Sequence, residues 1–98
     1  MKIYCFDIDG TICSTIDGNY EDAKPYIARI NQINSLHEEG NMIILFTARG
    51  TKTGIDWRQL TEHQLKNWGV FYDDLLFGKP EADIFIDDKA QDIFNWFE

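Results

Sequence analysis

The chain has 98 residues, of which 44% are hydrophobic and 14% aromatic, which predicts one soluble domain over residues 1–98 with a single core. Its formal net charge of −8 argues against nucleic acid and anionic membranes as partners, because neither would meet a basic surface. The sequence shows no signal-peptide pattern and no apolar run long enough for a membrane span, so we expect a cytoplasmic protein. Cys5 and Cys13 form no CxxC pair, which argues against a disulfide framework or a zinc site.

Four short apolar runs are typical of buried strands, and they lie at about residues 2–8, 42–47, 75–77 and 82–87. Hydrophobic residues at helical spacing predict helices between Pro25 and Gly40 and between Asp56 and Gly69, with a short third helix at residues 90–97. Pro25 suits the first turn of a helix, Asp56 suits an N-cap, and the two glycines suit helix ends. Strands that alternate with helices favour a parallel sheet with right-handed crossovers.

Polar side chains follow each of the four predicted strands. They are Asp7 and Asp9, Thr47, Lys79, and Asp87 with Asp88. In a parallel sheet the carboxyl ends of the strands share one edge, which is where ligands of open α/β sheets bind. Asp7 and Asp9 would repel each other there unless a cation or a shared proton compensated them, which suggests Mg²⁺ with oxygen ligands. The alternative is a strand end capped by an Asx-turn, with both carboxylates solvated.

The run Asp7-Ile8-Asp9-Gly10-Thr11 resembles the DxDGT motif of the haloacid dehalogenase superfamily. Three further motifs of that family have counterparts in the same order, at Thr47, at Lys79, and at Ile86-Asp87-Asp88 with Asp92. The resemblance implies a Rossmann-like three-layer α/β sandwich with a small parallel sheet of strand order 3-2-1-4. It also implies phosphoryl transfer through an aspartyl-phosphate, with Mg²⁺ as the cofactor.

The resemblance assigns a role to each motif residue. Asp7 would be the nucleophile, and Asp9 would protonate the leaving alcohol and later deprotonate water. Thr47 would hydrogen-bond the transferring oxygens, and Lys79 would neutralise their charge. The expected phosphate-binding residues are Gly10, Thr11, Thr47, Ala48, Arg49 and Lys79. The expected Mg²⁺ ligands are Asp7, Asp9 through its backbone carbonyl, Asp88 and Asp87.

Several of these assignments leave alternatives open. At the fourth motif we favour Asp88 as the direct metal ligand, with Asp87 and Asp92 behind it. Arg49 is compatible with binding a substrate anion and equally with a surface ion pair. Taken alone, Thr47 is compatible with an ordinary strand-end hydroxyl and Lys79 with a solvated lysine in a turn. Three tryptophans fit helix faces and are interpreted as core residues rather than stacking platforms: Trp57, Trp68 and Trp96.

Many relatives in this superfamily carry an inserted cap domain, and this chain has no room for one. Residues 10–24 predict a loop that can hold a flap, and the link between Phe77 and Lys79 is too short for any insertion. The site should therefore be open unless a second copy or a partner subunit covers it. Residues 46–50, Asp56-Trp57 and residues 77–83 resemble small capless members near bacterial surface-polysaccharide genes.

The expected activity is that of a Mg²⁺-dependent phosphomonoester hydrolase acting on a small phosphorylated metabolite such as a sugar phosphate. A phosphotransferase or mutase would keep the same first half-reaction and is one alternative. The other is a non-catalytic interaction domain with a degenerate site.

Overall fold

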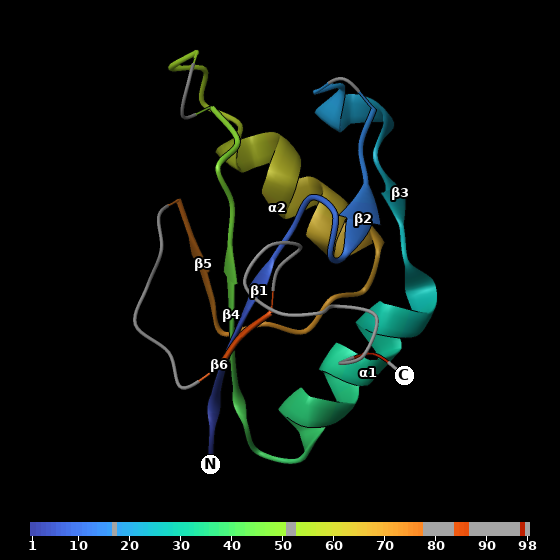
Figure 1. Cartoon of the computed structure of the whole chain (residues 1–98), viewed down its shortest axis with the longest axis vertical. Helices are drawn as coiled ribbons and strands as arrows, with labels where there is room; N and C mark the ends of the chain where they lie inside the picture. Colours follow the sequence, from blue (N-terminus) through green and yellow to red (C-terminus); the bar gives the residue numbers. More distant parts are fainter. Residues whose placement is uncertain (17, 51–52, 78–83, 87–96, 98) are drawn as a thin grey trace.

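The computed structural model describes residues 1–16, 18–50, 53–77, 84–86 and 97. Within these residues a parallel four-stranded sheet has the order β5-β4-β1-β6 (Figure 1). Its strands are β1 (Ile3–Asp7), β4 (Met42–Phe46), β5 (Asp74–Leu76) and β6 (Ile84–Ile86). All four coincide with the predicted apolar runs to within about two residues at most ends, because a sheet strand buried on both faces needs continuous apolar sequence.

A second, two-stranded antiparallel sheet is formed by β2 (Cys13–Ser14) and β3 (Lys24–Pro25). The sequence analysis predicted a loop for this segment. For the main sheet it predicted the strand order 3-2-1-4, in which only the four strands of that sheet were numbered. With β2 and β3 included in the count, the main sheet reads β5-β4-β1-β6. The prediction that Pro25 begins a helix was wrong: Pro25 pairs with Cys13 in β3, and the helix starts two residues later.

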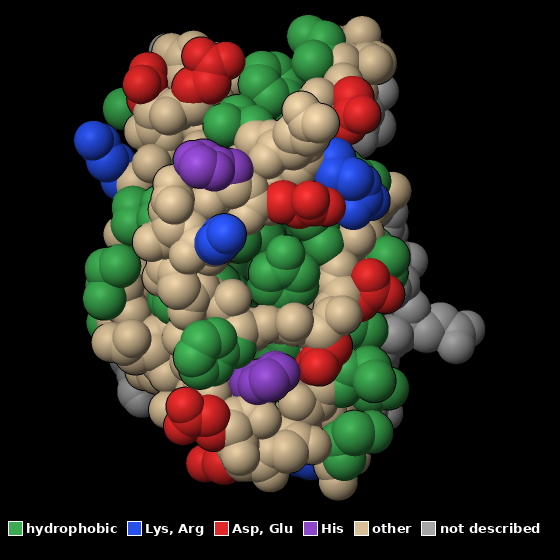
Figure 2. Space-filling view, turned by 180° about the vertical axis from the view of Figure 1, so that it is seen from behind, with side chains coloured by type: hydrophobic (Ala, Val, Ile, Leu, Met, Phe, Trp, Pro, Cys, Tyr) green, Lys and Arg blue, Asp and Glu red, His purple; other side chains and the backbone are tan. Residues whose placement is uncertain are grey.

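Two helices, α1 (Ile27–Glu38) and α2 (Arg58–Asn67), lie on the same side of the sheet (Figure 1). Figure 2, seen from behind, shows histidine side chains on this face; His37 lies on α1 and His63 on α2. A right-handed crossover from β1 to β4 and another from β4 to β5 run in the same direction, which puts both helices on one face. The described residues do not test the third layer of the expected sandwich.

The predicted helix ends are confirmed. Gly40 has φ +93° and its N–H donates to the His37 carbonyl at 3.1 Å, which places it just beyond the C-cap of α1. Gly69, with φ +71°, ends α2 in the same way. At the start of α2 the prediction was wrong by one residue: Trp57 is the N-cap, and the carboxylate of Asp56 just before it accepts from the Arg58 N–H at 3.0 Å.

The core lies between the sheet and the two helices. Its fully buried members come from every part of the fold and include Phe6, Ile12, Ile33, Leu45, Leu65 and Ile86. Tyr26 and Ile27 were expected on the buried face of the first helix, yet they are 38% and 54% exposed. The Tyr26 N–H bonds to the Ile12 carbonyl at 2.7 Å, so this segment follows the β2–β3 sheet and misses the core.

The predicted helix at residues 90–97 lies outside the described residues, except for Phe97. Phe97 packs against the core, with its ring centroid 6.2 Å from that of Phe6. Across the described ranges, none of the helices combines the length and the apolar character needed to cross a membrane.

Candidate active site

Asp7 and Thr47 meet at the carboxyl edge of the sheet. Asp7 is the last residue of β1 and pairs in register with Phe46, and Thr47 follows directly in the neighbouring strand. The Asp7 Oδ1 accepts from the Ile8 N–H at 2.9 Å, and the side chain is half-buried. Thr47 is buried, and its Oγ1 accepts from the Arg49 N–H at 3.0 Å. That bond uses a lone pair of the oxygen, so the hydroxyl retains its proton for donation.

A tight loop follows Asp7 and contains Asp9. The Ile8 carbonyl accepts from the N–H groups of Thr11, Ile12 and Cys13 at 3.2, 2.9 and 3.3 Å. Gly10 adopts φ +87°, a left-handed conformation that glycine reaches without steric cost, and its N–H donates to the Cys13 carbonyl at 2.8 Å. The N–H groups of two predicted phosphate-binding residues, Gly10 and Thr11, are therefore used within the loop.

Arg49 carries a buried, bidentate ion pair with Asp9. Its Nη2 donates to Asp9 Oδ1 at 2.8 Å and its Nε to Oδ2 at 3.0 Å, and the Arg49 side chain is 0% exposed. The third nitrogen, Nη1, donates to Thr61 Oγ1 at 3.1 Å and to Gln64 Oε1 at 2.7 Å. The sequence analysis allowed a surface ion pair here; the pair is buried because both hydrogen-bonding helix residues and the sheet edge enclose the guanidinium.

The fork of Arg49 gives it a positioning role. A planar guanidinium that holds both carboxylate oxygens fixes the side-chain direction as well as the charge of its partner. Every nitrogen of the Arg49 side chain already donates to a protein acceptor. Contact between Arg49 and a substrate anion stays a prediction. Sequence reasoning missed both Thr61 and Gln64 as partners of Arg49. The available signal was Gln64, a polar residue among hydrophobic residues spaced as one face of the predicted helix.

The flap formed by β2, the short 3-10 helix η1 (Tyr20–Asp22) and β3 is attached to the same network. The Tyr20 ring centroid lies 4.6 Å from the guanidinium carbon of Arg49, and the Gln64 amide donates to the Tyr20 carbonyl. The Tyr20 ring also meets Trp57 edge-on, with centroids 5.1 Å apart. Arg49 therefore joins the loop after β1, the flap and α2.

Cys13 sits beside this network but is not suited to nucleophilic chemistry. Its Sγ lies 3.6 Å from Asp9 Oδ1 and 3.7 Å from the Ile8 carbonyl. Burial raises the pKa of the Cys13 thiol to about 12, and the Asp9 carboxylate adds to this rise while Arg49 opposes it. The thiol therefore stays protonated at neutral pH, and only a thiolate is an effective nucleophile.

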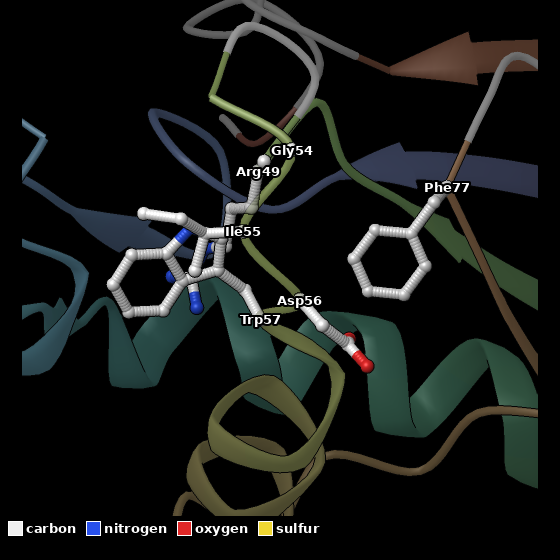
Figure 3. A pocket seen from close by; sticks show the side chains of 7 residues that line it. Arg49, Gly54, Ile55, Asp56, Trp57 and Phe77 are labelled. Atoms are coloured by element: carbon white, nitrogen blue, oxygen red, sulfur yellow. The ribbon is translucent and has the colours of Figure 1, made fainter.

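A pocket of about 310 Å³ lies at the loop after β4 (Figure 3). It is lined by residues 49–50 and 54–57 of the loop after β4 and by Phe77 after β5. Gly50 makes the loop possible: at φ +85°, a Cβ here would collide with the Ile55 carbonyl oxygen. Trp57, interpreted from the sequence as a core residue, is only partly buried and lines this pocket.

The remaining predicted site residues lie outside the described part of the chain. They are Lys79, Asp87, Asp88 and Asp92. Within the described part, no three histidine, cysteine or acidic side chains are grouped to hold a metal ion. The Asp9 carboxylate is engaged by Arg49. Ala48 is exposed at the edge of the sheet.

Comparisons with known proteins give structural likenesses only, since no family model and no curated protein matches the chain. The crystal structure of an MCSG target protein from Vibrio cholerae shares 28% identity with a TM-score of 0.79, over 99% of this chain and 88% of that one. A chain of the Pnkp1/Rnl/Hen1 complex shares 21% identity with a TM-score of 0.62, over 93% of this chain and 30% of that one.

A third likeness is to D,D-heptose 1,7-bisphosphate phosphatase from B. bronchiseptica, whose structure contains magnesium and phosphate. The identity is 17% and the TM-score 0.59, over 85% of this chain and 52% of that one. Together with the strand order, these likenesses show that the chain has a haloacid-dehalogenase-like α/β fold.

Proposed function

We propose that the chain is a Mg²⁺-dependent phosphomonoesterase that works through an aspartyl-phosphate on Asp7. One observation carries the proposal: Asp7 ends β1 and Thr47 follows β4, and the two strands are hydrogen-bonded neighbours. A nucleophilic carboxylate and a hydroxyl donor thereby share the edge at which open α/β sheets bind ligands. The haloacid-dehalogenase-like fold supports the same reading.

In the proposed reaction, an Asp7 oxygen attacks the phosphorus and the bond to the leaving alcohol breaks, with a proton from Asp9 passing to that alcohol. Water then attacks the phosphorus, Asp9 accepts its proton, and the bond to Asp7 breaks to release inorganic phosphate. Each Asp9 oxygen accepts one hydrogen bond from Arg49, and Oδ1 also accepts from the Cys13 thiol at 3.6 Å, so Oδ2 is the oxygen with a further lone pair for proton transfer. Arg49 would set the direction from which Asp9 acts.

Mg²⁺ fits the chemistry of the proposed donors, which are hard oxygens. They are the Asp7 carboxylate, the Asp9 backbone carbonyl, and Asp88 or Asp87 beyond the described residues. The engagement of the Asp9 carboxylate by Arg49 agrees with a ligand set that uses its carbonyl instead. When bound, the ion would supply positive charge to the phosphoryl oxygens, and Lys79 would supply more.

We further propose a single capless domain acting in the cytoplasm on small phosphorylated metabolites, of the type found near surface-polysaccharide genes. The likeness to a component of an RNA repair complex carries the fold alone, and the net charge of −8 argues against a polyanionic substrate. Transfer to an acceptor other than water would make the chain a phosphotransferase. Phosphate release measured with and without an added alcohol distinguishes hydrolysis from such transfer.

The test is Asp7→Asn, which keeps the shape of the side chain and removes its nucleophilic oxygen anion. Mg²⁺-dependent phosphate release should fall by about 10⁴ or more, while circular dichroism stays that of the wild type. Glu38→Gln, an exposed change at the far end of α1, is the matched control and should retain full turnover. A folded Asp7→Asn protein with turnover near that of the wild type would overturn the proposal.

A further inference from the structure

The pocket at the loop after β4 combines aromatic, aliphatic and acidic groups in a small volume. Two of its apolar side chains are accessible to a ligand, because Ile55 is 52% exposed and Phe77 is 38% exposed. Asp56, Trp57 and Phe77 all line the pocket, and Figure 3 shows the Asp56 carboxylate on the side of the pocket that faces α2. At about 310 Å³ the pocket is at the lower end of the roughly 300–1,000 Å³ typical of ligand sites, so it suits a single small ring.

The pocket is next to the proposed reaction centre. Its loop begins two residues after Thr47, and Phe77 follows β5, whose Leu76 carbonyl accepts from the Thr47 N–H at 3.1 Å. Neighbouring strands of a sheet are about 4.8 Å apart, so the pocket over β4 and β5 is about one or two strand spacings from Asp7 at the end of β1. A phosphoryl group at Asp7 would leave the rest of a small substrate over this pocket.

Asp56 supplies an acidic group to the lining of the pocket, which favours a ligand with hydrogen-bond donors. An ionised carboxylate only accepts hydrogen bonds, and one Asp56 oxygen is already used by the Arg58 N–H. Apolar contact is supplied by Trp57, Phe77 and Ile55. A ring with an apolar C–H face and hydroxyl groups on its rim satisfies both requirements, and that is the chemistry of a monosaccharide.

We propose that this pocket is the leaving-group subsite, which binds the sugar ring of a hexose phosphate while the phosphoryl group reaches Asp7; the proposal rests on the proposed function. Trp57 and Phe77 contact the C–H face of the ring, and Asp56 accepts from its hydroxyls. Specificity for the sugar then resides in residues 54–57, outside the motifs that carry the chemistry.

A nucleobase fits this pocket less well. Flat bases favour a slot between two accessible ring faces. Here the guanidinium of Arg58 lies 4.6 Å from the Phe77 ring centroid and covers one face, and Tyr20 packs against Trp57. The lining also includes the Asp56 carboxylate, which favours a ring with hydroxyls over a stacked base.

The key variant is Asp56→Asn, because the asparagine oxygen can still accept from the Arg58 N–H and so preserve this contact at the start of α2. Trp57→Phe and Trp57→Ala form a second pair, in which the first keeps an aromatic face. Glu38→Gln is the control outside the pocket. The substrates are hexose 1-phosphates and 6-phosphates, acetyl phosphate, which has no ring to fill the pocket, and nucleoside 5′-monophosphates. The readouts are kcat/KM for phosphate release and saturation-transfer NMR of the free hexoses.

We expect a hexose phosphate to be preferred over acetyl phosphate. Asp56→Asn should reduce that preference by at least about tenfold, since a hydrogen bond to a charged group is lost. Trp57→Ala should do the same, Trp57→Phe should lose less, and Glu38→Gln should change nothing. An unchanged preference in Asp56→Asn and Trp57→Ala, or a wild-type preference for nucleoside monophosphates, would overturn the subsite.

Failure of the proposed function has a different signature. If the wild type releases phosphate from no substrate, the hydrolase proposal fails, and the NMR measurement alone decides the pocket. Hexose binding that weakens at least about tenfold in Asp56→Asn would support the sugar site in a non-catalytic protein, whereas no hexose binding by the wild type would overturn it. Phosphate release from acetyl phosphate without hexose preference would retain the function and overturn the subsite.

Discussion

Arg49→Met is the change that most directly tests the buried network at the candidate site. Methionine fills most of the volume of the arginine stem but removes both hydrogen bonds to Asp9 and those to Thr61 and Gln64. The Asp9 side chain is 24% exposed, so its stranded charge regains some water but remains largely enclosed. Thr61, which is fully buried, loses its guanidinium donor without access to solvent.

The expected loss follows from these contacts. Removing one partner of a buried ion pair typically costs about 3–5 kcal/mol, and the partial exposure of Asp9 favours the lower half of that range. The unsatisfied acceptors on α2 add to the cost. We therefore expect the free energy of unfolding to fall by about 3–5 kcal/mol, which corresponds to a decrease in Tm of at least about 12 °C for a chain of this size.

The measurement is urea unfolding followed by circular dichroism, with Arg58→Met as the matched control. Arg58 forms an exposed ion pair with Glu62 at 3.4 Å, with side-chain exposures of 46% and 49%, and such a pair contributes only about 0.3–0.5 kcal/mol. Arg49→Lys keeps the charge and loses the fork, so it should fall between wild type and Arg49→Met. Equal losses for Arg49→Met and Arg58→Met would show that the buried network does not stabilise the fold.

Two further predictions concern the same region. Gly50→Ala should destabilise the fold more than Gly54→Ala in the same urea assay. Both residues have positive φ, which costs about 1–2 kcal/mol for alanine, but only at Gly50 would the new Cβ meet a backbone oxygen. Equal losses of stability in the two variants would contradict this collision. Burial raises the pKa of the Cys13 thiol from 9.0 to about 12, so the unfolded chain loses this proton first and the free energy of unfolding should fall as pH rises from about 9 toward 12. Cys13→Ala should show a shallower fall, and an identical pH dependence would refute the assignment.

The sheet and both described helices could be predicted from the sequence because their signals are local. Continuous apolar runs mark β1 and β4, and Gly40 and Gly69 mark helix ends through a backbone conformation that other residues avoid. Pro25 misled the prediction because its fixed φ suits an extended strand as well as a helix start, and only the pairing with Cys13 decides between them.

The candidate site was predictable in part for the same reason. Asp7 and Thr47 follow apolar strands, so the topology alone brings them together. The partner of Asp9 could not be found in this way, because Arg49 lies forty positions away and its burial depends on how α2 packs. The pocket likewise depends on the partial exposure of Trp57. Hydrophobic residues at helical spacing predict which face of a helix is buried, but not how exposed a residue at the end of that helix remains.

The position of β1 in the sheet has a consequence for synthesis. Tyr4 pairs with Ile43 on one edge and with Ile84 on the other, so β1 leaves the ribosome well before β6, its neighbour on the second edge. At about 5–20 residues per second, that interval is about 4–16 s. Throughout it, an apolar strand has one edge without its native neighbour, and such an edge can pair with another nascent chain. We expect expression yield to depend on translation rate and on chaperones that shield β1 until β6 has emerged.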